Sequence, residues 1–208
     1  MTSAPTLFDR SALALRRARV TEDALFLHHA AVEEAQDRLS MVKRTFTDVA
    51  IVTPFPEIWR PAFPDARIVA DEDTLDLTPD AQDLVIHAMA MHWANDAVGQ
   101  LIQSRRALRP DGLFLGMMLG GTTLADLRAM GETNVLAQRL RRPSRRAIFA
   151  EAERLYPRTD ANRLIAEFEL ICLTGWSPDE SQPKPLRPGS ARTRLADALG
   201  TSETPLAD

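Results

Sequence analysis

Apolar residues in the middle of the chain form short runs separated by polar turns. Four runs have the length and apolar content of buried strands: Val49 to Val52, Arg67 to Ala70, Asp83 to Ile86 and Leu113 to Leu119. Between the last two runs a helix is predicted, opened by Asn95 and ended by the turn "RPDG" at 109–112. Its expected core-facing side carries Val98, Leu101, Ile102, Arg105 and Leu108. Strand, helix and strand at this spacing predict βαβ units, and hence a parallel sheet covered by helices.

Residues 7–46, which precede these strands, are predicted to be helical. Thr21 is a suitable N-cap, because Glu22 and Asp23 follow it in the first turn and acidic groups complement the helix dipole there. The helix that it opens has an apolar stripe made of Leu25, Val32, Ala35, Leu39, Val42 and Phe46. His28 and His29 lie beside this stripe. Adjacent helix residues do not face one point, so solvated or partly buried histidines are expected here rather than a metal pair.

The last third of the chain divides into three parts. Residues 122–156 are predicted to be helical, with interruptions at Gly131 and Pro143 and a cap at Ser144. The segment "LIAEFELICL" at 164–173 alternates: Glu167 and Glu169 share one face, and Phe168, Leu170 and Cys172 share the other. This pattern predicts a half-exposed strand near a sheet edge, with Cys172 as a small core residue. The predicted domains are a helical segment at 1–46, an α/β domain at 47–176 and a proline-rich tail at 177–208.

Composition narrows the classes of function. Hydrophobic residues make up 45% of the 208 residues and charged residues 26%, as in an ordinary globular protein. The net charge of -4 argues against general attraction to nucleic acid. The single cysteine, Cys172, can form neither an intramolecular disulfide nor a cysteine metal cluster, and no metal site is predicted. No leader pattern or membrane-length apolar run is visible, so a cytoplasmic protein without a membrane span is expected.

Several ordered blocks of sequence match one family. They are "LFDR" at 7–10, "RRAR" at 16–19, "VADEDTL" at 69–75, "DLVIHAMAMHWAND" at 83–96, "RRALRPDGLFLGMMLGGTTL" at 105–124, "MGETN" at 130–134 and "LTGWSPDESQPKPLRPGSA" at 173–191. The chain thereby resembles the class I S-adenosylmethionine-dependent methyltransferases, in the branch that holds the biotin-pathway malonyl-carrier methyltransferase and the mitochondrial complex I assembly factor that hydroxylates an arginine. The resemblance implies an α/β fold with a reduced, mostly parallel Rossmann-like sheet, N-terminal helices, and S-adenosylmethionine as the cofactor, if one is bound.

The resemblance also points to four candidate cofactor-binding residues. Asp71 and Glu72 directly follow a predicted strand. In relatives the acidic residue there faces the adenine of the cofactor. A purely structural position, in a solvated loop or at a helix cap, explains these two residues equally well. His92 and Trp93 lie just past the carboxyl end of the next strand, where open α/β sheets bind ligands, and there a packing role has the same weight. No catalytic residue can be assigned.

Two departures from the family concern the cofactor site. Where relatives have a glycine-rich loop after the first strand, this chain has Thr53, Pro54, Phe55, Pro56 and Glu57, and prolines remove backbone donors. Val49 to Ala70 comprises only 22 residues, whereas one βαβ unit takes about 30 residues. The second strand of relatives, whose terminal acid holds the cofactor ribose, is therefore expected to be missing. Only Glu57 or Asp65 could replace that acid.

A further shortening follows Gly120 and Gly121. The stretch "GGTTLADLRAMGETN" at 120–134 joins two blocks that a helix and a strand separate in relatives. Two functions are therefore weighed. The first and favoured one is a non-catalytic binding or assembly protein with a protein partner, and a homodimer or a stable heteromer is expected because the shortened sheet exposes apolar surface. The second is an active methyltransferase or arginine hydroxylase in which Asp71 holds adenine, His92 and Trp93 line the site, and a substrate arginine or carboxylate of a protein enters over Gly120 and Gly121.

Overall fold

The computed structural model of the chain describes residues 6–120, 136–138, 154, 158–162 and 168–179. Residues Met1–Pro178 form one compact unit and residues Asp179–Asp208 another. Most of the helical region predicted at 122–156, and the tail beyond Asp179, lie outside the described residues. Those two predictions and the predicted domain boundaries therefore stay predictions.

The described part of the chain contains a five-stranded sheet with the order β2-β1-β3-β4-β5. Its strands are β1 (Val49–Val52), β2 (Arg67–Val69), β3 (Gln82–Ala88), β4 (Leu108–Gly120) and β5 (Glu169–Trp176). β2, β1, β3 and β4 run parallel, and β5 pairs antiparallel with β4 at the edge. This confirms the mostly parallel sheet and the edge strand that the sequence predicts. The chain runs from β1 through the short helix α3 to its parallel neighbour β2, so a single short crossover connects these two strands.

Six helical elements accompany the sheet in the described residues. They are α1 (Arg10–Arg17), the 3₁₀ turn η1 (Glu22–Leu25), α2 (Phe26–Ser40), α3 (Pro56–Trp59), the 3₁₀ turn η2 (Met91–Trp93) and α4 (Ala97–Ala107). The prediction of N-terminal helices is confirmed, but Thr21 opens η1 rather than α2 and its side chain makes no capping bond. Instead, the side chain of Asp9 caps α1 by accepting a bond from the Ala12 N–H.

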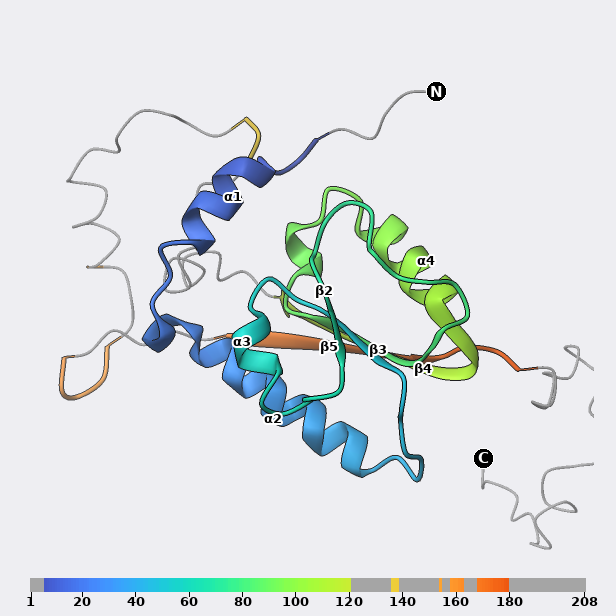
Figure 1. The fold of residues 1–208 in the computed structure, drawn as a ribbon. Coiled ribbons are helices and arrows are strands. Elements are labelled where there is room, and N and C mark those ends of the chain that lie inside the picture. Colours follow the sequence, from blue (N-terminus) through green and yellow to red (C-terminus); the bar gives the residue numbers. More distant parts are fainter. Residues whose placement is uncertain (1–5, 121–135, 139–153, 155–157, 163–167, 180–208) are drawn as a thin grey trace, which may run out of the picture. The chain divides into compact units, whose positions relative to one another are not determined.

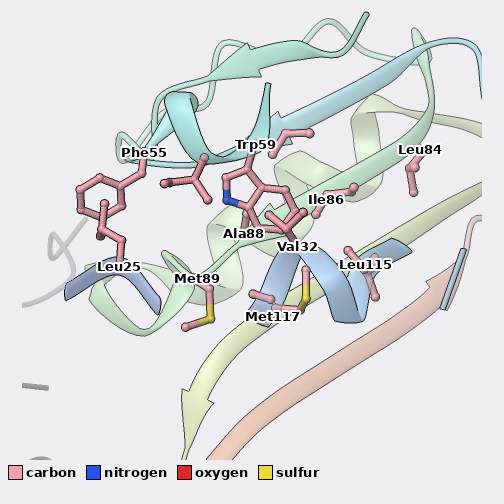
Figure 2. Packing of buried hydrophobic residues seen from close by; sticks show 14 of the residues in the cluster. Leu25, Val32, Phe55, Trp59, Leu84, Ile86, Ala88, Met89, Leu115 and Met117 are labelled. Carbon is pink, nitrogen blue, oxygen red and sulfur yellow. The ribbon is translucent and has the colours of Figure 1, made fainter. Parts of the chain in front are cut away.

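Helices cover both faces of the sheet (Figure 1). Alternate residues of β1 and β3 point to opposite faces, so Ile51 and Ile86 join one core cluster while Ala50 and Val85 join another. The larger cluster lies beneath α2 and α3 and includes Val32 and Trp59 (Figure 2). The smaller cluster lies beneath the end of α4. The predicted α/β layering is therefore confirmed.

The predicted orientation of α4 is wrong. Val98 and Ile102, expected to face the core, are 66% and 47% exposed, while α4 buries Gln100, Ser104 and Ala107. The predicted cap is also wrong by one residue. Asp96 caps α4 by accepting a bond from the Gly99 N–H, and the Asn95 side chain instead accepts bonds from the N–H groups of Leu7 and Phe8.

The "RPDG" segment is a bulge within β4 rather than a turn before it. Asp111 has a φ of 60° and donates its N–H to the carbonyl of Ser177, whose N–H bonds the carbonyl of Gly112. A left-handed residue followed by a glycine at this place is typical of a β-bulge, which lets the ladder to β5 begin immediately. The bulge is where the β4–β5 pairing starts.

Candidate functional site

The carboxyl ends of three parallel strands meet at one edge of the sheet. Thr53 follows β1, Asp71 lies just beyond β2, and residues 89–93 follow β3. β2 and β3 lie on opposite sides of β1, so the connection reverses direction between β1 and β3. Ligands of open α/β sheets bind at such a reversal. This edge, with the N-terminal helices beside it, is the candidate site.

The loop after β1 has little capacity to bind a ligand through its backbone. The Thr53 N–H donates to the carbonyl of Val69, and the Phe55 N–H donates to the hydroxyl of Thr53. Pro54 and Pro56 have no N–H to offer. Every backbone donor from residue 53 to residue 56 is therefore absent or already used. A loop of this kind cannot form the row of free N–H groups that binds anionic ligands at other α/β edges.

Side chains of the chain itself pack where a glycine loop would leave room. Phe55 is buried, and its ring meets the imidazole of His28 edge to face at 4.7 Å between centroids. Trp59, one turn further on in α3, is fully buried in the same cluster with Val32 and Ala88 (Figure 2). Phe55 and Trp59 thus fill the segment after β1 with apolar core.

Asp71 is held by two arginines from α1. Arg17 Nη1 lies 3.0 and 2.9 Å from the two carboxylate oxygens, and Arg10 Nη1 lies 3.3 Å from Oδ2. Arg10 also donates through Nη2 to the Asp71 carbonyl. The side chains of Asp71 and Arg17 are only 7% and 10% exposed, so this is a largely buried charge cluster. The carboxylate is therefore engaged by cations of the chain itself, and its role toward an adenine stays a prediction.

Glu72 plays a different part from Asp71. Its side chain points to solvent, with a long 3.9 Å contact to Arg10, while its carbonyl accepts a bond from Gln100 Nε2 at 2.9 Å. Gln100 Oε1 in turn lies 2.9 Å from Nε2 of the buried His87. With Gln100 in this orientation, His87 carries its proton on Nε2. This polar chain joins β3, α4 and the segment after β2, and it accounts for the burial of the polar face of α4.

His92 and Trp93, the other two candidates, lie at the same edge. Trp93 is buried against Leu13 of α1 and meets Phe8 edge to face at 5.3 Å. His92 is half-buried, its ring is 5.2 Å from that of Trp93, and neither ring nitrogen has a hydrogen-bond partner among the described residues. The contacts of Trp93 are therefore those of a packing residue that docks the N-terminal segment.

The two proposed substitutes for the ribose-binding acid occupy different places in the fold. Asp65 precedes β2, at the amino end of the strand and thus at the opposite edge of the sheet, and Glu57 is exposed on α3. Gly120 ends β4, and a side chain there would collide with Ile171. Gly121 lies outside the described residues. No group of three or more potential metal ligands occurs in the described ranges.

Three histidines beside the charge cluster are held neutral. Burial, and then the charges of Arg17, His92 and His29, lower the pKa of His28 from 6.5 to about 3. Burial and then Arg17 lower the pKa of His92 to about 4, although Asp71 acts in the opposite direction. Burial likewise lowers the pKa of His87. His28 is fully buried, which corrects the expectation of a solvated or partly buried helix histidine.

Because these buried histidines resist protonation in the folded chain, the free energy of unfolding is expected to fall in acid. The unfolded chain takes up a proton at His28 below pH 6.5, whereas the folded chain does so only near pH 3, so stability is complete above pH 6.5 and declines as the pH falls. We expect His28→Leu to remove about 3 kcal/mol of this decline between pH 6.5 and pH 4, from 1.4 kcal/mol per unit. Urea unfolding across this pH range measures it. His29→Leu, at an exposed neighbour, is the control; equal pH slopes in both variants would contradict the prediction.

The residues that occupy the site were not predicted from the sequence. Arg10 and Arg17 are seven positions apart, which places them on one face of α1. This spacing could have indicated that they share an acidic partner such as Asp71, which follows a predicted strand. Phe55 was noted only as a residue that is not glycine, and the buried role of Gln100 has no apolar pattern to reveal it. With donors absent from residues 53–56 and Asp71 neutralised by arginines, the described residues do not fit S-adenosylmethionine in the manner of a glycine-loop site.

Comparisons with known proteins agree with the blocks of resemblance. No family model matches the chain. The "Arginine-hydroxylase NDUFAF5, mitochondrial" of Danio rerio is 27% identical in an alignment that covers 62% of this chain and 60% of that protein. The "Malonyl-[acyl-carrier protein] O-methyltransferase" of a Methylovorus species is 39% identical over 62 residues, covering 30% and 21% of the two chains.

A solved structure is also similar to this chain. A Burkholderia thailandensis 1,6-didemethyltoxoflavin-N1-methyltransferase aligns over 86% of this chain and 94% of its own, with 16% identity and a TM-score of 0.45. The present chain spans less than two thirds of the length of the curated relatives it matches first, 60% and 42% for two NDUFAF5 proteins. By its sequence relatives, the chain is similar to NDUFAF5 arginine-hydroxylases and to malonyl-carrier O-methyltransferases, in agreement with its resemblance to the class I S-adenosylmethionine-dependent methyltransferases.

Proposed function

We propose that this chain is a non-catalytic member of its family that acts as a binding or assembly protein with a protein partner. The observation that carries the proposal is the loop after β1, in which no backbone N–H from residue 53 to residue 56 is available to a ligand. The Phe55 ring, packed on His28, adds a steric reason. The two arginines on Asp71 add an electrostatic one.

The proposal is consistent with what the chain retains. The N-terminal segment remains docked through Asn95, Trp93 and Asp71, contacts that do not involve the loop after β1. Such docking holds α1 in place without help from the loop after β1. Among the described residues no helix combines the length and the apolar character needed to cross a bilayer. A cytoplasmic location and the absence of nucleic-acid binding stay predictions from composition.

Titration with S-adenosylmethionine and with S-adenosylhomocysteine tests the proposal. We expect no saturable heat in calorimetry and no rise in melting temperature at ligand concentrations in the millimolar range, whereas a micromolar site is worth about 8 kcal/mol and is easily detected. A methyltransferase known to bind the cofactor, titrated in the same buffer, serves as the positive control.

Saturable binding would overturn the proposal and favour the enzyme instead. In that alternative a methyltransferase or arginine hydroxylase holds the cofactor in an altered pose, with Asp71, Glu72, His92 and Trp93 around it. The Arg10 and Arg17 contacts to Asp71 would then have to rearrange. Arg10→Ala would strengthen binding under this alternative, because it frees one side of the carboxylate. It would leave the silent titration unchanged under the proposed function.

A further inference from the structure

The edge strand β5 lacks the features that normally keep sheet edges apart. Exposed edges are usually protected by charges, prolines or short strands. β5 is eight residues long and contains no proline, and its seven residues from Leu170 to Trp176 carry no charge. In the described sheet β5 is terminal, with β4 on one side only. Trp176 is 43% exposed, and the position of a Cβ at Gly175 is open.

The bulge at the start of β4 fixes which backbone groups of β5 point outward. The bond from the Ser177 N–H to the Gly112 carbonyl is the first of the β4–β5 ladder. Bonded and non-bonded pairs then alternate along an antiparallel ladder, so Gly175 and Leu173 bond to β4. The residues between them present N–H and C=O groups to the outer edge. This outward set is Leu170, Cys172, Thr174 and Trp176.

A twofold axis can pair this edge with itself. In an antiparallel ladder, a residue that points its backbone outward must face another of the same kind. An axis at Leu173 pairs Leu170 with Trp176 of a second copy and Cys172 with Thr174 of that copy. All four outward-pointing residues of each strand are then bonded. No other axis uses all four within the strand.

The side chains are compatible with the same axis. The exposed Trp176 ring gains the apolar Leu170 side chain of the second copy as its cross-strand neighbour, a favourable type of pair. The one charged residue of β5, Glu169, lies at the end of the strand, so the two Glu169 carboxylates stand at opposite ends of the paired strands. Self-pairing therefore brings no like charges together, which argues for a second copy as the occupant of this edge.

We propose that two copies of this chain associate through their β5 edges, antiparallel about a twofold axis at Leu173, into one continuous sheet. This names the surface for the homodimer expected from the shortened sheet. The dimer does not depend on whether the cofactor binds. Titration with S-adenosylmethionine therefore tests the proposed function alone, and the experiments below test the dimer alone.

Light scattering on the purified full chain tests the association. We expect a dimer of the 23.1 kDa chain, and a folded monomer for Thr174→Pro. Thr174 points its N–H away from β4, so proline removes a bond of the dimer and none of the internal ladder. Ile102→Lys, which alters an exposed apolar residue of α4, is the control and stays dimeric.

Cross-linking tests the axis. Leu173 faces its own copy in a non-bonded pair, with Cα atoms about 4.5 Å apart, a geometry that a disulfide can span. Cys172→Ser/Leu173→Cys is expected to form a covalent dimer under mild oxidation, and Cys172→Ser/Ile102→Cys is not. A monomeric wild-type chain, whether its edge is free or awaits another protein, would overturn the proposal. So would a dimer that survives Thr174→Pro, or an efficient cross-link through residue 102 alone.

Discussion

Asp71→Ala is expected to lower the free energy of unfolding by about 3–5 kcal/mol, because it leaves two cations at a largely buried place without their counter-ion. The largest part of this cost is expected at Arg17, since its side chain is only 10% exposed and bonds both carboxylate oxygens. Urea unfolding at neutral pH measures the loss. Should Asp71→Ala fail to fold, Asp71→Asn keeps one acceptor oxygen and gives a smaller loss that can still be measured.

A matched pair on the surface provides the control. Arg67 and Asp76 are 2.8 Å apart, but Asp76 is 90% exposed, and Asp76→Ala is expected to cost less than about 1 kcal/mol. Asp71→Ala/Arg17→Leu should recover part of the loss, because the double change removes one of the uncompensated charges. Equal effects at Asp71 and Asp76 would contradict the buried character of the cluster.

Trp59→Ala is expected to destabilise the chain by about 3–5 kcal/mol, the usual cost of a cavity left by a large buried aromatic side chain. Trp59 is fully buried between α3 and the cluster that contains Val32 and Ala88 (Figure 2). Its indole nitrogen has no hydrogen-bond partner among the described residues, so Trp59→Phe should cost much less. Thermal and urea unfolding of the three chains measure this order.

Trp176 offers the control for the same substitution. It is 43% exposed within one copy and stacks on Phe46 with ring centroids 6.4 Å apart, so in the monomeric Thr174→Pro background Trp176→Ala is expected to cost about 1 kcal/mol. If Trp59→Ala cost no more than Trp176→Ala, the aromatic filling of the segment after β1 would be looser than its burial indicates. The steric part of the proposed function would then lose its support.

The sheet was predictable from sequence because each strand is a short apolar run bounded by turn residues. The single crossover between β1 and β2 followed from chain length alone, and the half-exposed edge strand followed from alternation around Phe168 and Cys172, whereas its antiparallel direction was not predicted. These are local signals, and they depend little on distant contacts.

The helix faces and the site were less predictable, because distant polar partners decide them. α4 turns Val98 outward because Gln100, on its other face, bonds His87 and the Glu72 carbonyl. Asn95 binds the backbone of Leu7 and Phe8 instead of capping α4, and leaves that role to Asp96. No window of a dozen residues contains such partners.

The engagement of Asp71 by α1 also has a kinetic consequence. Its two ion pairs join residues that are 61 and 54 positions apart, so each closes a long loop and contributes to a high contact order. During synthesis the arginines of α1 are made well before Asp71. They therefore remain solvated, without this partner, until β2 and the residues after it have been made. We therefore expect the N-terminal segment to dock late, after β1 and β2 have formed the surface that it contacts.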